Sequence, residues 1–148
     1  MSKKAPLLLI LALLVMVSSL PGSATVGEGK SIQYNLIIRT NDDVNRFSLD
    51  TKLFTCYFNN GSDYMIEAGE DYSIEVRKGL RWERHGASIY VKMLLYFLKP
   101  GMSSPIYVLL NWDEVQEVPL TEGHYRVRKD VTVNGEEASA FFEFYMIP

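Results

Sequence analysis

The feature that most constrains the fold is a stretch near the C-terminal end of the chain, Leu120-Thr-Glu-Gly-His-Tyr-Arg-Val-Arg128. Gly123 allows the backbone to bend, and from Tyr125 onward apolar and polar residues alternate, which predicts a β-strand. A tyrosine at the start of such a strand is typical of the corner of a β-sandwich. Its ring turns inward, and its hydroxyl bonds to the backbone a few residues upstream. We therefore expect Gly123 and Tyr125 to form a structural corner where two sheets meet.

The N-terminal segment has the pattern of a secretory signal peptide. Two lysines precede an unbroken apolar run over residues 7–17, and a Pro-Gly pair and small residues follow. We predict cleavage after Ala24, which removes residues 1–24 and leaves 25–30 as a flexible lead-in. An uncleaved anchor is the alternative, but a spanning helix needs roughly 20 apolar residues. We therefore expect a secreted or cell-surface protein with no stable membrane span after cleavage.

Composition restricts the partners of the exported chain and the source of its stability. Loss of the two leader lysines leaves 13 basic against 18 acidic residues, a net charge of −5. Such a surface gives no electrostatic reason to bind nucleic acid or an anionic membrane. Cys56 is the only cysteine, so no disulfide can form within the chain. Hydrophobic packing must therefore stabilise the domain.

Alternating apolar residues predict seven to eight short strands over residues 31–148, separated by regular turn signals. The expected strands are 31–40, 47–59, 72–78, 80–84, 87–98, 105–111, 124–133 and 138–146. Residues 87–98 are also long enough for a helix, but their β-branched and aromatic content favours a strand. Asn134-Gly135 is the strongest hairpin signal, so the last two strands should be neighbours. We therefore expect an all-β, immunoglobulin-like sandwich of two antiparallel sheets.

Two landmarks of antibody domains are missing from this pattern. Cys56 falls where the first cysteine of the inter-sheet disulfide would lie, but Val127 takes the place of the second. The third strand also lacks the usual tryptophan. We expect Cys56 to face Val127 across the core as a small apolar contact.

Three runs of sequence resemble the bacterial Ig-like domains of exported Gram-positive proteins. They are Leu98-Lys-Pro-Gly101, Leu110-Asn-Trp112 and Leu120-Thr-Glu-Gly-His-Tyr-Arg-Val-Arg-Lys129. That family typically carries the pattern L-x-P-G … W … L-x-x-G-x-Y-R-h-x-K, in which h is apolar. The resemblance covers roughly residues 31–148, and its motifs occupy turn, corner and core positions. It implies a fold and an extracytoplasmic location, but no reaction and no site residues.

No set of residues has the spacing of a known catalytic or metal site. Cys56 is expected to point inward as an inert thiol, while His85 lies in a loop and His124 points outward, so no nucleophile has a base. Acidic loops such as 41–45 offer oxygens for calcium, but they lack EF-hand spacing, and turns also favour Asn and Asp. We predict a non-enzymatic protein with no catalytic residue, no metal site and no cofactor.

The candidate binding surface is the outer face of the sheet centred on strand 124–133. Six residues of three strands are predicted to lie on it: Glu75, His124, Arg126, Arg128, Phe141 and Tyr145. Exposed aromatic rings beside arginine are typical of protein interfaces. The alternative is that loops or the N-terminal lead-in cover the rings.

We expect an exported, non-enzymatic module that binds an unidentified protein or cell-surface component. A carbohydrate-binding module is the first alternative, with four rings as stacking platforms: Trp82, Tyr90, Tyr96 and Trp112. A small exported enzyme built on the thiol of Cys56 is the second alternative.

Overall fold

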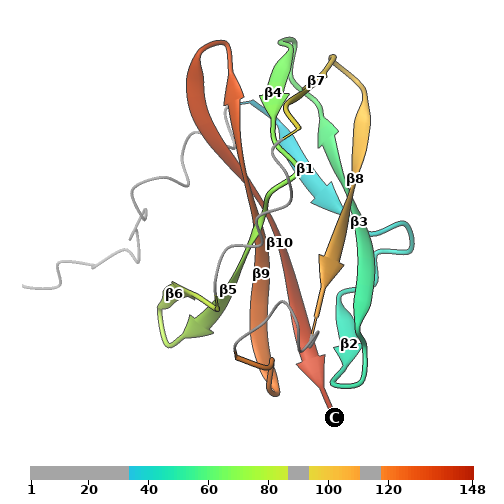
Figure 1. The fold of residues 1–148 in the computed structure, drawn as a ribbon, viewed down its shortest axis with the longest axis vertical. Coiled ribbons are helices and arrows are strands. Elements are labelled where there is room, and N and C mark those ends of the chain that lie inside the picture. Colours follow the sequence, from blue (N-terminus) through green and yellow to red (C-terminus); the bar gives the residue numbers. More distant parts are fainter. Residues whose placement is uncertain (1–33, 87–93, 111–117) are drawn as a thin grey trace, which may run out of the picture.

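The computed structural model describes residues 34–86, 94–110 and 118–148, which form ten β-strands and no helix (Figure 1). The strands are β1 (Leu36–Arg39), β2 (Arg46–Ser48), β3 (Leu53–Asn60), β4 (Ile66–Ala68), β5 (Ser73–Lys78), β6 (Arg81–Arg84), β7 (Tyr96–Leu98), β8 (Ser103–Leu109), β9 (Gly123–Val133) and β10 (Glu136–Ile147). Within these described ranges, no helix is long and apolar enough to cross a membrane. The predicted leader and lead-in lie outside them.

The strands form two sheets that enclose one core (Figure 1). The smaller sheet has the order β1-β3-β8, and the larger has the order β2-β10-β9-β4-β7. Strand β5 also pairs with β9, and β6 pairs with β5. All pairs are antiparallel except β2 and β10, which run parallel. The predicted immunoglobulin-like sandwich is confirmed.

Two of the predicted strand assignments are wrong in detail. The single strand expected over 47–59 is in fact β2 and β3, because a turn in which Thr51 N donates to Ser48 O carries the chain from one sheet to the other. Strand β4 lies in a segment to which no strand was assigned, because three residues are too short for an alternating pattern to be recognised. Of the strand predicted over 87–98, the described part contains only β7, and residues 87–93 lie outside the description.

The predicted hairpin between the last two strands is confirmed. Asn134 and Gly135 both have positive φ, 51° and 78°, as a tight turn between twisted strands requires. The paired register then runs without interruption from Glu136 opposite Val133 to Met146 opposite Gly123.

Apolar residues of both sheets fill the core. Phe54 of β3 stacks on Phe47 with ring centroids 4.2 Å apart and meets Phe144 of β10 edge-on at 5.3 Å. Cys56 of β3 and Val127 of β9 are both fully buried in the same core cluster, on facing sheets as expected. Packing of this kind replaces the missing disulfide.

The tyrosine corner is present as predicted. The ring of Tyr125 is 1% exposed, and its hydroxyl donates to Thr121 O at 3.0 Å while accepting from Thr121 N at 3.2 Å. A Cβ atom on Gly123 would lie only 3.3 Å from Cε2 of this ring, so a larger residue would crowd the tyrosine. The corner therefore ties the start of β9 to the turn that precedes it.

A break between β4 and β5 is the least regular part of the larger sheet. Ala68 lies opposite Val131, and Ser73 lies opposite Arg128. Four residues, 69–72, therefore connect β4 to β5 where β9 has only two, 129–130. The break therefore shifts β5 by two positions relative to the register that β4 begins.

Lys129 fills the break between β4 and β5. Its side chain is 1% exposed, and its Nζ donates to the carbonyl oxygens of Gly69 and Asp71. Burial lowers the pKa of the ammonium group, and the nearby carboxylates, Asp71 first among them, oppose that shift. The ammonium thus satisfies backbone carbonyls that the sheet leaves unpaired.

Tyr125→Phe is expected to lower the free energy of unfolding by about 1 kcal/mol, because it removes a buried hydroxyl that both donates and accepts. Urea denaturation measures the change. Tyr107→Phe is the matched control, since that hydroxyl lies on an exposed ring, and it should leave stability unchanged. Equal stability of the two variants would contradict the role of the corner.

Lys129→Met is expected to cost about 1–3 kcal/mol, because the carbonyls of Gly69 and Asp71 lose the ammonium donor of two part-buried hydrogen bonds. The control is Lys78→Met, which removes an exposed ion pair with Glu83 and should cost less than about 1 kcal/mol. Urea denaturation compares the two. An equal or smaller loss for Lys129→Met would show that the ammonium does not stabilise the break.

Candidate binding surface

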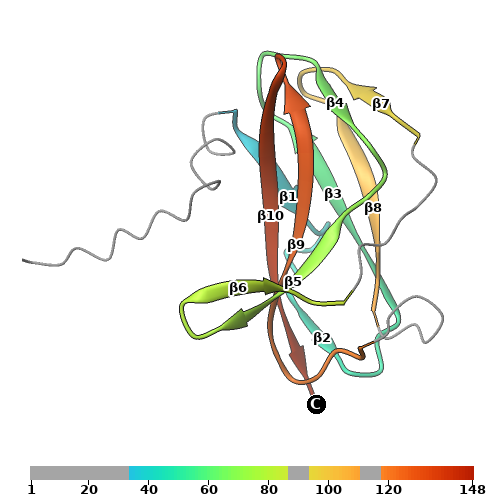
Figure 2. The ribbon, with the colours of Figure 1, turned by 60° about the vertical axis from the view of Figure 1, so that its left-hand side comes forward.

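The register of the larger sheet brings the predicted surface residues together. Glu75 of β5 and Glu143 of β10 both lie opposite Arg126 of β9. Phe141 lies opposite Arg128, and Tyr145 lies opposite His124. The predicted grouping of three strands is thus correct in position. Figure 2 shows the β5–β6 hairpin extending sideways from the sheet beside β9 and β10.

Arg126 is at the centre of this surface, but it is not exposed. Its Cζ lies 4.5 Å from the ring centroid of Trp82 and 4.1 Å from that of Phe141. Its Nε donates to Oε2 of Glu75 at 2.5 Å. Only 7% of Arg126 and 8% of Glu75 is exposed. The sequence predicted their outward direction correctly, but stacking and pairing bury both groups.

Arg128 lies beside Arg126 on the same strand and also contacts Glu75 and Phe141. Its Nε donates to Oδ1 of Asp130 at 2.8 Å, and its Nη1 lies 3.6 Å from Oε1 of Glu75. Its Cζ also lies 5.9 Å from the centroid of Phe141. Desolvation by burial lowers the pKa of the guanidinium, but Asp130 and then Glu75 together outweigh it, so the pKa of Arg128 is raised.

His124 and Tyr145 continue the surface on the other side. Their rings stack with centroids 4.3 Å apart and planes 14° apart. Nε2 of His124 lies 2.9 Å from Oε2 of Glu143, and the imidazole also meets the ring of Trp82 edge-on at 5.0 Å. Cζ of Arg46 lies over Tyr145 at 5.6 Å. Arginines and rings thus alternate across the sheet from β6 to β2.

We name this surface the arginine–aromatic face. Its eleven residues come from five strands: Arg46 (β2), Glu75 and Arg77 (β5), Trp82 and Arg84 (β6), His124, Arg126 and Arg128 (β9), and Phe141, Glu143 and Tyr145 (β10). Tyr145 is 36% exposed, while the rings of Trp82 and Phe141 are half-buried. Within the described structure the cover over Arg126 comes from these rings. The lead-in over 25–30, the alternative cover, lies outside the described residues.

Three residues of the face, Arg46, Trp82 and Arg84, were missed by the sequence-based prediction. Trp82 was expected only as a sugar platform on an edge strand. The turn signal at Gly79, which has a positive φ of 61°, could have placed Trp82 opposite Arg77 in a hairpin. Arg46 lies just before the run taken as a strand, so nothing in the alternation pointed to it. Parallel pairing with Tyr145 brings it to the face.

The rings proposed as sugar-stacking platforms are largely engaged in contacts within the protein. Trp82 already contacts the guanidinium groups of Arg77 and Arg126, and Tyr96 is half-buried with Nζ of Lys129 at 5.9 Å from its centroid. Trp112 and Tyr90 lie outside the described residues. The two rings within the described structure are therefore not open stacking platforms.

The thiol-enzyme alternative also lacks support. Cys56 is fully buried, and burial raises the pKa of its thiol to about 12. Nε2 of His85 bonds to Val118 O at 3.0 Å, while His124 pairs with Glu143. Among the residues that the structure describes, no three His, Cys, Asp or Glu side chains gather as a metal site would require.

We expect Cys56 to remain unlabelled by a thiol reagent in the folded protein at neutral pH, because only the thiolate reacts. The free energy of unfolding should also fall above pH 9.0, where the unfolded thiol loses its proton while the native thiol keeps it up to about pH 12. Urea denaturation at about pH 7.5 and about pH 9.5 measures this loss.

Cys56→Ala is the matched variant for this measurement, and its stability should fall less between the two pH values. Rapid labelling of the folded wild-type protein at neutral pH would instead show an accessible thiolate and reopen the thiol-enzyme alternative.

Comparison with protein families identifies one match. The sequence profile described as bacterial Ig-like domain matches residues 33–144, a range that includes the corner and most of the arginine–aromatic face. Comparison with curated proteins finds none that matches the chain.

Proposed function

Because the chain belongs to the family of bacterial Ig-like domains, we propose that it is an exported, non-enzymatic module that binds another protein through the arginine–aromatic face. Family membership supports a module without catalysis, and such domains are typically extracellular. The apolar run over residues 7–17 and the small residues up to Ala24 support export.

The observation that carries this proposal is the preformed stack around Arg126. Arginine, tryptophan and tyrosine are the residues that dominate the binding energy of protein interfaces. Here Trp82 and Tyr145 are held in place by Arg126 and His124 before any partner arrives. A partner therefore meets rings whose conformational freedom is already restricted, which reduces the entropic cost of binding.

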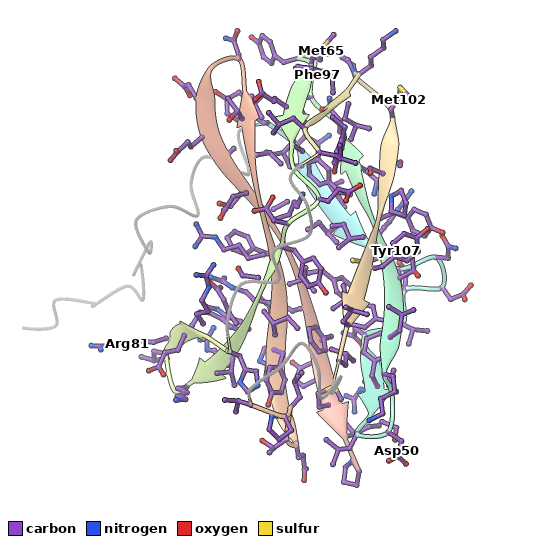
Figure 3. All side chains as sticks on the ribbon, viewed as in Figure 1. Asp50, Met65, Arg81, Phe97, Met102 and Tyr107 are labelled. Carbon is purple, nitrogen blue, oxygen red and sulfur yellow. The ribbon has the colours of Figure 1, made fainter. Side chains whose placement is uncertain are left out.

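The outer face of the smaller sheet is the competing surface. It exposes Tyr107 of β8, which is labelled in Figure 3 and is 61% exposed. Within the described residues Tyr107 makes no ring or cation–π contact, so nothing there holds it as His124 holds Tyr145. We therefore place the binding surface on the larger sheet.

Photo-crosslinking tests the proposal without knowledge of the partner. We expect a photoreactive phenylalanine analogue at position 145 to form specific crosslinks to a protein on cells that export the chain. The same analogue at position 107, on the opposite sheet, is the matched control and should form none. The crosslinked species is detected by gel electrophoresis and mass spectrometry.

A second variant shows whether the crosslink depends on the stack. Trp82→Ala should reduce crosslinking from position 145, because it removes a ring that contacts both His124 and Arg126. Equal crosslinking from positions 145 and 107, or none from position 145, would contradict binding at the arginine–aromatic face.

A further inference from the structure

We infer that the partner presents an acidic polypeptide segment in extended form, and that Arg46 and Arg77 bind its carboxylates. This inference rests on the proposed function, since it names the chemistry of the partner at the same face. It follows from a count of paired and unpaired charges, from the spacing of the arginines and from the rings between them.

The carboxylates at this face are all paired. Glu75 binds Arg126 and Arg128, Asp130 binds Arg128, and Glu143 binds His124. Each of these acids already has a partner within 4 Å, an arginine for Glu75 and Asp130 and the imidazole of His124 for Glu143.

Three arginines of the face lack such an acid. Among the residues that the structure describes, Arg46, Arg77 and Arg84 make no ion pair. The face as a whole carries five arginines against the carboxylates of Glu75, Glu143 and the adjoining Asp130. The chain has a formal net charge of −3, so this positive surface stands out in an acidic molecule. Charge complementarity therefore favours an acidic partner.

Two of the unpaired arginines lie over aromatic rings. Cζ of Arg77 lies 5.2 Å from the centroid of Trp82, and Cζ of Arg46 lies 5.6 Å from that of Tyr145. A guanidinium stacked on a ring keeps its N–H donors at the edge, where a carboxylate can accept two of them. Nε of Arg77 already donates to Gly79 O at 2.8 Å, which leaves its terminal amino groups for a ligand.

The two stacked arginines lie on one row across the sheet. Tyr145 is opposite both His124 and Arg46, and the next position of the β5–β9 register places Arg77 beside His124. Three inter-strand spacings separate Arg77 from Arg46, a span of about 14 Å. An extended peptide covers this distance in about four residues at roughly 3.3 Å each. Carboxylates four residues apart therefore fit the row, and both point to the same side of the peptide.

A polypeptide fits this face better than a polyanion such as nucleic acid or polyphosphate. A phosphate chain needs a continuous track of cations, but Glu75 and Glu143 interrupt the arginines. Between Arg77 and Arg46 the surface presents the rings of His124 and Tyr145, which suit the apolar side chains of a peptide.

Peptide selection on the full secreted chain tests the inference. A library of random peptides is selected for binding to the wild-type protein. Each peptide has about 12 residues, so that it exceeds the four-residue span of the row. The Kd of labelled winners is measured by fluorescence anisotropy at low and high NaCl. We expect the winners to carry Asp or Glu pairs four residues apart and to bind more weakly in high salt. Arg46→Gln and Arg77→Gln should each weaken binding about threefold to fivefold.

Arg39→Gln is the matched control, because Arg39 is an exposed arginine on β1 of the other sheet, and it should leave the Kd unchanged. Winners without acidic enrichment, or binding unaffected by both face variants, would overturn the inference. Tighter binding of polyphosphate that depends on Arg46 would also overturn it, in favour of a polyanionic ligand. If position 145 forms crosslinks but the selected peptides are not acidic, the proposed function is supported and only the inference of an acidic partner is wrong.

Discussion

The arrangement of the larger sheet depends on one buried ammonium group. Lys129 points to the core side of β9, where Tyr125 and Val127 also point, and its Nζ occupies the break between β4 and β5. The break shifts β5 by two positions, and this shift places Glu75 opposite Arg126. If β5 continued the register begun by β4 with no break, Ser73 would lie opposite Arg126 instead. A group on the inner side of the sheet thus stabilises the break that sets which charges meet on its outer side.

The pair that this shift creates explains how an arginine can be buried on an outer face. A charge removed from water is costly unless a counter-charge and further contacts compensate for it. Glu75 supplies the counter-charge to Arg126, and Trp82 and Phe141 supply ring faces on which a guanidinium stacks favourably. Buried ion pairs of this kind are weak evidence for stability, since apolar residues of similar volume often serve as well. Their better-supported role is to fix one arrangement of neighbouring groups, which here is the arrangement of the arginine–aromatic face.

The parts of the fold that could be predicted are those that local chemistry determines. Gly123 with Tyr125 indicates a corner, and Asn134-Gly135 indicates a hairpin, because few other residues adopt those conformations. The sequence also contains a signal that β2 and β3 are separate strands, which the prediction of one strand over 47–59 did not use. Inward residues are odd-numbered up to Leu49 and even-numbered from Phe54, and such a change means that the strand has ended. The position of Trp82 over Arg126 could not be predicted, because it depends on the two-residue shift and on contacts between strands far apart in the sequence.

Strand β9 connects the core to the proposed binding surface. Its odd-numbered residues, such as Tyr125 and Val127, are buried between the sheets, while the alternate positions of Arg126 and Arg128 form the outer face. A slip of one residue in its pairing would exchange the two sets and bury cationic side chains in an apolar core. The corner at one end and the Asn-Gly turn at the other prevent that slip, since each fixes the register independently. The hydrogen bond of Tyr125 therefore contributes to the order of the outer face as well as to stability, although its hydroxyl never reaches that surface.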